Sequence, residues 1–339
     1  PYSDNGIKFF SANGHKLSDE AEQRIEQALD AEPPVLPAHA LGRTMALHGA
    51  LDDYLRELQV RFQSLRLDGL DVLLDCANGA TYRAAPEIFR RLGARVQAIA
   101  DAPDGRNINA ECGSTHISTL ADAVVAGGHD VGFAFDGDGD RMLAVDRSGA
   151  IVDGDELIAL AALHLRASDR LPGNGVAVTV MTNYGFGQAM EAAGVEVAVT
   201  NVGDRYVLEE LRRRGWTLGG EQSGHIIDLS FAPSGDGIAA ALLTLEALGA
   251  RDLADRDAMR KLPQRLVNVP VGDGEAPLSA VEVEHAIARE TAALEGRGRV
   301  LVRPSGTEPL VRVMVEAPTE HEARDVCDRL VAAVDAARV

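Results

Sequence analysis

Three aspartates separated by single glycines carry the clearest chemistry in the sequence. Asp136, Asp138 and Asp140 lie in FDGDGDR, directly after an apolar stretch that begins at Val131. Because the intervening glycines have no Cβ, a tight loop can direct all three carboxylates toward one point. Such a cluster is repulsive unless a cation fills it, and hard oxygen ligands suit Mg²⁺ or Ca²⁺. The pattern predicts a divalent metal site, and the competing interpretation is a solvated acidic turn.

Two familiar acidic loops match this stretch only in part. An EF-hand also begins Asp-x-Asp-x-Asp, but Arg141 stands where it needs glycine and Arg147 where the closing glutamate belongs. Phosphatases of the haloacid-dehalogenase type begin with Asp-x-Asp-Gly after a strand. In those phosphatases a Thr or Val is expected after the glycine, and the motif lies near the N-terminus of the chain. Neither condition holds here. Such a phosphatase stays a distant alternative, in which Asp136 would be phosphorylated.

The stretch RPSGTEPLVR, residues 303–312, has the parts of a phosphate-binding loop. It combines two hydroxyls, backbone N–H groups that glycine leaves accessible, and two arginines, Arg303 and Arg312, for charge and bidentate bonding. The alternative is a plain hairpin turn, since Pro, Ser and Gly are common turn residues. The flanking arginines favour the phosphate interpretation.

The stretch GGEQSGH, residues 219–225, suits a sugar. Glu221 and Ser223 lie two residues apart in one glycine-rich loop. The glutamate can accept a hydrogen bond and the serine hydroxyl can donate one, which suits two neighbouring hydroxyls of a sugar. His225 taken singly is more often a structural histidine than a catalyst.

Two further residues have weaker signals. Asp204, in NVGDRY, could be no more than the N-cap of a helix that runs through Leu211. Lys8 follows the turn pair Asn5-Gly6 on a short strand, where a charge can simply discourage edge pairing.

Two strand–helix–strand units are predicted to position these loops. The first has strands at 72–75 and 96–99 around a helix at 84–92, and the second has strands at 176–180 and 195–199 around a helix at 187–193. Because both carry the same turn chemistry, they predict tandem related α/β domains with βαβ connections and mixed sheets.

The flanking segments differ from these units. Helices are predicted at 18–31 and 44–65. The last part reads as strand 266–269, helix 279–294, strands 299–302 and 310–316, and helix 320–337, which is a smaller α+β unit with a hairpin. The predicted domains are 1–66, 67–165 with the metal loop, 166–262 with the sugar loop, and 263–339 with the phosphate loop.

Composition limits the partners. The chain has 339 residues, is 46% hydrophobic and 25% charged, and has a formal charge of -19. This charge argues against a nucleic-acid or acidic-membrane partner, because both require basic patches. No apolar run approaches the length of a membrane span. Three widely spaced cysteines, Cys76, Cys112 and Cys327, are typical of a protein of the reducing cytoplasm.

Taken together, these stretches resemble the α-D-phosphohexomutase superfamily, and more closely its bacterial phosphoglucosamine mutase branch. The matches occur in order along the chain: NGIKFFS, NINAECGSTH, FDGDGDR, VGDRYVLE, GGEQSGH and RPSGTEPLVRVMVE. The resemblance implies four domains around a central cleft. The first three would be related α/β folds, in agreement with the repeat, and the fourth a smaller α+β domain.

The resemblance also implies a reaction. Members transfer a phosphoryl group between O6 and O1 of a sugar, through an active-site phosphoserine and a bisphosphate intermediate. In this branch glucosamine 6-phosphate and glucosamine 1-phosphate are interconverted, for UDP-N-acetylglucosamine and cell-wall synthesis. The alternatives are a phosphomannomutase/phosphoglucomutase and a non-catalytic phosphosugar-binding fragment. Members of the branch often dimerise, so a homodimer is among the expected assemblies.

The resemblance assigns roles in metal binding and sugar binding to individual residues. The resemblance makes Asp136, Asp138 and Asp140 the Mg²⁺ ligands and Arg141 a holder of the serine-bound phosphate. The sugar hydroxyls would contact Glu221 and Ser223.

Roles for the second phosphate and for proton transfer follow in the same way. The non-reacting phosphate would be held by Arg303, Ser305, Gly306, Thr307 and Arg312. Lys8 lies at the family position for proton exchange with the sugar hydroxyl, and His225 is a second candidate.

The resemblance assigns the phosphoserine to no residue of this sequence. In the family it lies in Ser-His-Asn-Pro, which leads into the turn before Lys8, and that proline would be Pro1. We therefore expect the serine three residues before Pro1, an incomplete first domain, and a chain that is inactive by itself. Ser3 and Ser11 lack the context of the motif.

Overall fold

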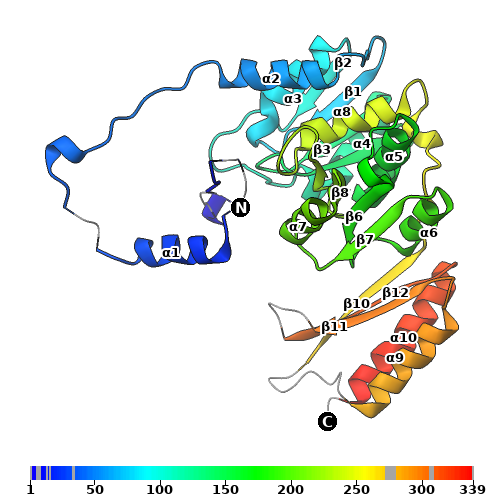
Figure 1. Ribbon diagram of the computed structural model, residues 1–339. Helices are drawn as coiled ribbons and strands as arrows, with labels where there is room; N and C mark the ends of the chain where they lie inside the picture. The colour runs from blue at the N-terminus through cyan, green and yellow to red at the C-terminus, as the bar shows by residue number, and fades with distance from the viewer. Residues whose placement is uncertain are drawn as a thin grey trace. The chain divides into compact units, whose positions relative to one another are not determined.

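The computed structural model describes residues 2–4, 9–12, 14, 17–32, 35–271, 280–304 and 309–337 (Figure 1). The chain forms two compact units. The first comprises Pro1–Val180 and Glu196–Arg256, and the second comprises Met181–Val195 and Asp257–Val339. Within the described part of the chain, none of the helices combines the length and apolar character needed to span a bilayer.

The first unit contains two sheets. The first sheet is built from β1 (Asp71–Asp75), β2 (Arg95–Ile99), β3 (Val131–Phe135), β4 (Met142–Asp146) and β5 (Ile151–Val152). The second is built from β6 (Gly175–Thr179), β7 (Glu196–Thr200), β8 (Leu218–Gly220) and β9 (Ile226–Asp228). The helices of this unit are α1 (Asp19–Leu29), α2 (Ala50–Arg61), α3 (Ala84–Arg91), α4 (Ser118–Gly127), α5 (Gly154–Ala167), α7 (Asp204–Arg214) and α8 (Gly237–Leu248).

The two sheets share one plan. Their strand orders are β2-β1-β3-β4-β5 and β7-β6-β8-β9. In each, three parallel strands are followed by an antiparallel partner, which is β4 beside β3 and β9 beside β8. The prediction of tandem, related mixed-sheet α/β domains is therefore confirmed. The plan puts both FDGDGDR and GGEQSGH at the same place, the hairpin that follows the third parallel strand.

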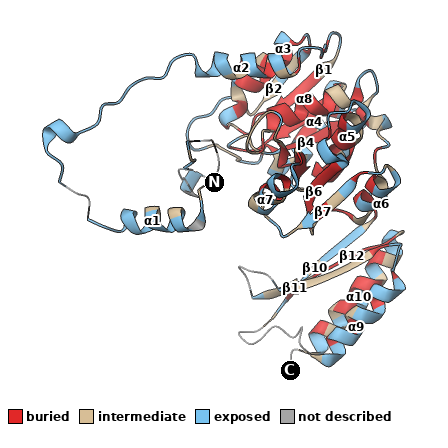
Figure 2. Ribbon diagram, viewed as in Figure 1, coloured by how far each residue is buried: buried red, intermediate tan, exposed pale blue. Residues whose placement is uncertain are grey.

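Apolar strands and small residues account for this packing. All five residues of β3 and all five of β6 are buried, as expected of central strands that are covered on both faces. Figure 2 shows that β6 and much of α5 and α8 are buried, whereas α2 is largely exposed. Gly132 in β3 allows close packing, because an added Cβ would come 2.6 Å from Val124 of α4. Helices α5 and α8 pack on each other, α5 also contacts β8, and α8 also contacts β3, β4 and β9. These helices join the two sheets into one unit.

The N-terminal segment corrects one prediction. The helix predicted over 44–65 starts only at Ala50, because Gly49 adopts a left-handed conformation (φ 85°) that a continuing helix cannot contain. Ser18 caps α1, since its side chain accepts a hydrogen bond from Ala21 N. Of the short strand predicted around Lys8, residues 7 and 8 lie outside the described residues.

The second unit is the predicted smaller α+β domain. Its antiparallel sheet has the order β10-β12-β11, from β10 (Gln264–Pro270), β11 (Arg299–Pro304) and β12 (Leu310–Glu316). It also contains α6 (Tyr184–Ala192), α9 (Val281–Ala293) and α10 (Glu320–Ala336). Helix α10 packs against α9, β10 and β12.

Helix α6 belongs to this unit because of a buried carboxylate. Glu316, at the end of β12, is fully buried, accepts a hydrogen bond from Tyr184 N at 2.9 Å and pairs with Arg299 at 3.0 Å. Asn183 adds two hydrogen bonds to the backbone of Leu262, at 3.0 and 2.9 Å. Residues 181–195 follow β6 in the chain, yet they are tied to the C-terminal sheet. The predicted four-domain boundaries stay a prediction.

A second buried carboxylate gives a pH-dependent stability prediction. The side chain of Glu290 on α9 is 4% exposed, and hydrogen bonds from Arg329 and Arg289 lower its pKa to about 2. A lowered folded-state pKa adds stability that is complete above the ordinary value of 4.5 and is lost as the pH falls toward about 2. Because both arginines are largely exposed, we expect Glu290→Gln to cost about 1 kcal/mol at pH 7.

Chemical denaturation of both proteins at several pH values between 7 and 3 measures this effect. The difference between them should shrink below pH 4.5, the ordinary value for glutamate. Glu284→Gln, on the exposed side of the same helix, is the matched control and should change little at any pH. A Glu290→Gln difference that stays constant down to pH 3 would contradict the assignment.

Candidate active site

The acidic loop is the hairpin between β3 and β4. Asp136, Asp138 and Asp140 each offer an oxygen, and these oxygens all lie within 4.8 Å of one another, close enough to hold a metal ion. Asp136 is 9% exposed, and its Oδ1 accepts hydrogen bonds from Gly139 N and Arg141 N at 3.1 Å each. The loop therefore folds around Asp136, while the side chain of Asp138 is exposed.

The electrostatics of the loop fit a cation site. Burial, and then the charges of Asp140 and Asp138, raise the pKa of Asp136 to about 7. The guanidinium Nε of Arg141 lies 4.0 Å from Asp136 Oδ2 and 3.9 Å from Asp140 Oδ1, so it only partly offsets the negative charge. Convergent oxygens that repel one another are the donor set that a hard divalent cation stabilises.

The backbone of residues 79 and 80 supports the acidic loop. Ala80 N donates to Gly137 O at 2.9 Å, and Gly79 packs so closely on Gly137 that an added Cβ would overlap its carbonyl oxygen. The buried Asp75, at the end of β1, fixes the adjoining segments by accepting hydrogen bonds from Ala77 N at 2.9 Å and Gly113 N at 2.7 Å. Asp75 thus organises the backbone beside the acidic loop.

The glycine-rich loop is the hairpin between β8 and β9. Glu221 and His225 close it through a hydrogen bond from Glu221 N to His225 O at 3.1 Å. Oε1 of Glu221 accepts a hydrogen bond from Gly203 N at 3.0 Å, which sets the orientation of this carboxylate. Ser223 is exposed at the tip. The loop therefore presents one oriented acceptor and one hydroxyl, and its contact with sugar hydroxyls stays a prediction.

The structure brings the acidic and glycine-rich loops together. Met142 N donates to Gly224 O at 3.0 Å, which joins the start of β4 to the glycine-rich loop. His225, which is 3% exposed, has its Nε2 3.6 Å from Asp140 Oδ2 and 3.6 Å from Asp204 Oδ2. Asp204 is the first residue of α7 and Gly203 is the N-cap, so the predicted capping role of Asp204 is wrong. Its side chain approaches His225 instead.

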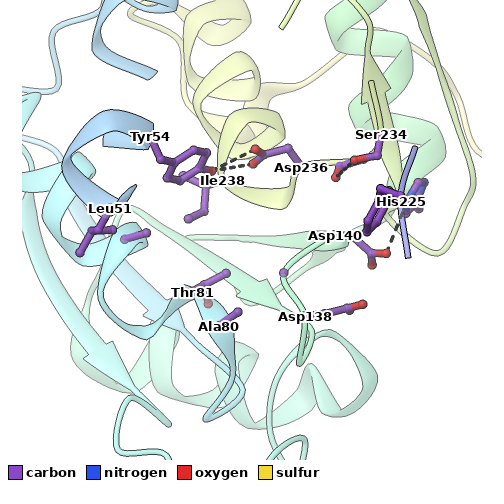
Figure 3. Close-up of a pocket in the computed structure, with 14 residues that line it drawn as sticks. Leu51, Tyr54, Ala80, Thr81, Asp138, Asp140, His225, Ser234, Asp236 and Ile238 are labelled. Atoms are coloured by element: carbon purple, nitrogen blue, oxygen red, sulfur yellow. Dashed lines mark hydrogen bonds and ion pairs between the residues drawn. The ribbon is translucent and has the colours of Figure 1, made fainter. Parts of the chain in front are cut away.

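A cavity of about 480 Å³ opens beside the acidic loop (Figure 3). One wall carries Asp138, Asp140 and His225, and the opposite wall carries Leu51, Tyr54 and other residues of α2, α3 and α8. Sequence reasoning missed Tyr54 and Asp236, which meet in this cavity by a hydrogen bond across 182 residues. The one signal available was the Asp-Gly pair ahead of the apolar helix that starts at Gly237, which is typical of an N-cap.

The remaining predicted residues divide into two groups. Arg303 on β11 and Arg312 on β12 are paired residues in the register of the second unit's sheet, and both are half-buried. Arg303 Nη2 also lies 3.6 Å from Met181 Sδ. Outside the described residues lie Lys8, Ser305, Gly306 and Thr307.

Comparison with protein-family models places most of the chain in one family. Three models match in order: "Phosphoglucomutase/phosphomannomutase, alpha/beta/alpha domain II" over residues 52–149, "alpha/beta/alpha domain III" over 153–266, and "C-terminal domain" over 266–333. Among curated proteins, the phosphoglucosamine mutase of Pseudomonas fluorescens (strain Pf-5) is 50% identical over 334 residues, 97% of this chain and 75% of that protein. That of Nocardioides sp. (strain JS614) is 51% identical over 335 residues, 97% of this chain and 74% of that protein.

Solved structures show the same fold at low identity. A phosphoglucomutase/phosphomannomutase family protein from Burkholderia thailandensis has a TM-score of 0.69 and 22% identity, over 85% of this chain and 64% of that one. The N-acetylphosphoglucosamine mutase of Aspergillus fumigatus, solved with GlcNAc-6P and magnesium, has a TM-score of 0.68 and 21% identity, over 86% of this chain and 67% of that one. The chain thus spans about three quarters of the length of these curated relatives and about two thirds of these solved chains.

Proposed function

The chain belongs to the phosphoglucomutase/phosphomannomutase family, and we propose that it acts as a phosphoglucosamine mutase, an isomerase that interconverts glucosamine 6-phosphate and glucosamine 1-phosphate. The superfamily predicted from the sequence motifs is thereby confirmed. The observation that carries the reaction is the junction of the acidic and glycine-rich loops, through Met142 N to Gly224 O and through His225 beside Asp140. It supports a proposed cation site next to a proposed sugar site within the first unit.

The acidic loop fits Mg²⁺. We propose Asp136, Asp138 and Asp140 as its holders, because they are three convergent carboxylates, and burial together with the charges of Asp140 and Asp138 raises the pKa of Asp136. When bound, Mg²⁺ would offset the negative charge of a phosphoryl group during transfer. Arg141, beside two of these carboxylates, would add positive charge and help to hold the phosphoryl donor.

The glycine-rich loop would orient the sugar. Glu221, fixed by Gly203 N, would accept hydrogen bonds from hydroxyls, and the exposed Ser223 would supply a second contact. The same two side chains can serve either orientation of a bisphosphate, because the hydroxyls they contact remain when the phosphates change places. His225 is too buried to reach far into solvent and would keep Asp140 and Asp204 in place. A direct part for His225 in proton exchange stays a second candidate to Lys8.

In the second unit, Arg303 and Arg312 would bind a phosphate group. They face each other in the register of β11 and β12, at the strand ends that flank residues 305–308. Two guanidinium groups supply charge and bidentate donors, and Ser305, Gly306 and Thr307 would complete the cradle. The homodimer stays a prediction.

Calorimetric titration with hexose 6-phosphates tests the substrate. In the presence of Mg²⁺ we expect glucosamine 6-phosphate to bind more tightly than glucose 6-phosphate or mannose 6-phosphate, and Glu221→Gln to weaken binding of all three. In the phosphorylated enzyme, which would include the serine expected ahead of Pro1, kcat/KM should show the same order. Equal or better use of the mannose or glucose phosphate would replace the amino-sugar assignment by a phosphomannomutase/phosphoglucomutase. If none of the three phosphates binds, the proposed site itself is wrong.

A further inference from the structure

A tyrosine–aspartate pair ties two helices together beside the acidic loop (Figure 3). Tyr54 lies on α2, Asp236 immediately precedes α8, and the tyrosine hydroxyl lies 3.0 Å from each carboxylate oxygen. Burial, and then the charge of Asp236, raise the pKa of Tyr54 above its usual range, so the hydroxyl keeps its proton. Tyr54 therefore keeps the proton that it can donate to Asp236.

The same carboxylate fixes the start of α8. Oδ1 of Asp236 accepts a hydrogen bond from Ala239 N at 2.9 Å, and Asp236 has the extended backbone typical of an N-cap. One side chain thus receives the tyrosine hydroxyl from one direction and the helix backbone from another. As a result, the position of the first turn of α8 depends on Tyr54 of α2.

The first turn of α8 in turn holds the acidic loop. Gly237 N donates to Gly139 O at 2.9 Å, and Gly139 (φ 78°) is the residue between Asp138 and Asp140. The approach is close, because a Cβ added to Gly237 would come 2.7 Å from Arg141 O and 3.0 Å from Gly139 O. Two hydrogen bonds, from the Tyr54 hydroxyl to Asp236 and from Gly237 N to Gly139 O, are thus joined through the backbone between residues 236 and 237, and they connect Tyr54 to the segment between two of the three aspartates.

We propose that Tyr54 is a positioning residue for the metal loop, acting through Asp236 and the Gly237 N–H on the carbonyl of Gly139. This inference rests on the proposed function of the loop as a Mg²⁺ site. Tyr54 does not touch the ion. It holds three mutually repelling carboxylates in their convergent arrangement, so that binding requires less reorganisation of the loop.

A purely structural pair predicts something different. If Tyr54 only joined α2 to α8, its loss would lower the stability of the metal-free and Mg²⁺-bound protein equally, and the Mg²⁺ affinity would not change. A positioning residue instead changes the affinity itself. The rise in Tm that Mg²⁺ causes, compared between Tyr54→Phe and the wild-type chain, therefore distinguishes the two roles.

The experiment compares Tyr54→Phe with the wild-type chain by calorimetric Mg²⁺ titration and by thermal unfolding with and without Mg²⁺. We expect the Kd for Mg²⁺ to rise about tenfold, in the range of losses typical of residues that support metal ligands. The Mg²⁺-induced rise in Tm should shrink accordingly. Tyr184→Phe, which removes a hydroxyl from α6 in the second unit, should leave the Kd unchanged.

Asp236→Asn provides a second route to the same result. It keeps the size of the side chain and one carbonyl oxygen, but it removes the charge and the second acceptor for Tyr54. We expect it to weaken Mg²⁺ binding in the same direction, so the test survives if Tyr54→Phe is too unstable to purify. Unchanged Mg²⁺ affinity in the variants would overturn the positioning role while the metal site stands. Absence of Mg²⁺ binding by the wild-type chain would instead refute the proposed metal site, and the inference with it.

Discussion

Replacing Asp138 by asparagine should stabilise the metal-free protein and weaken its binding of Mg²⁺. Without Mg²⁺ we expect Tm to rise, because one of three converging negative charges is removed. With Mg²⁺ we expect the Kd to increase more than about a hundredfold, since a direct ligand should contribute more than the tenfold to hundredfold typical of supporting residues. Thermal unfolding with and without Mg²⁺, together with calorimetric titration, measures both effects.

The exposure of Asp138 makes this variant informative, because little packing is lost with the charge. Asp122→Asn removes an exposed carboxylate from α4 and should neither raise the metal-free Tm nor alter the Mg²⁺ affinity. If Asp138→Asn lowers the metal-free Tm and still binds Mg²⁺ like the wild type, the acidic loop is an ordinary turn and the metal assignment is wrong.

Gly154→Ala should displace the glycine-rich loop without touching any of its side chains. Gly154 is the first residue of α5, and its N–H donates to Gln222 O at 3.0 Å. An added Cβ would overlap the carbonyl oxygen of Glu221 and lie 2.9 Å from Gly224 N, so the loop backbone must move. We expect a loss of about 1–3 kcal/mol in stability. In the phosphorylated enzyme we also expect a roughly hundredfold fall in kcat/KM, because a displaced loop misplaces the sugar.

The matched control is Gly187→Ala on α6. Among the residues that the structure describes, no atom outside the adjacent residues and the helix's own backbone lies within 4 Å of the added Cβ, and alanine favours a helix over glycine by about 0.5–1 kcal/mol. Gly187→Ala should therefore be neutral or slightly stabilising, with kcat/KM unchanged. Wild-type kinetics in Gly154→Ala would show that the backbone position of residues 221–224 does not matter for the sugar.

The sequence predicted the features that are encoded locally. The acidic loop was recognisable because its three aspartates and two glycines are contiguous, and the buried strand before it is a plain apolar run. The repeated strand–helix–strand pattern was recognisable for the same reason. The sequence predicts the start of α2 six residues too early, because helix-compatible residues precede Gly49 and its left-handed conformation cannot be read from its type alone.

Features that depend on residues far apart in the chain could not be predicted. No local pattern links Tyr54 to Asp236, and their hydrogen bond follows from the packing of α2 near α8. The close approach of Gly154 to Glu221 depends in the same way on where α5 meets the second sheet. His225 was judged more often structural than catalytic from its type, and its burial between Asp140 and Asp204 could be known only from the fold.

The bonds that tie α6 to the C-terminal sheet have a practical consequence for dissecting the protein. A fragment cut at the predicted domain boundary before residue 263 would omit Asn183 and Tyr184, and would leave Glu316 buried with Arg299 but without the N–H of Tyr184. The C-terminal unit is discontinuous in sequence, so expression of its last segment alone does not reproduce it. A C-terminal fragment that keeps these contacts includes residues 181–195 as well as residues 257–339.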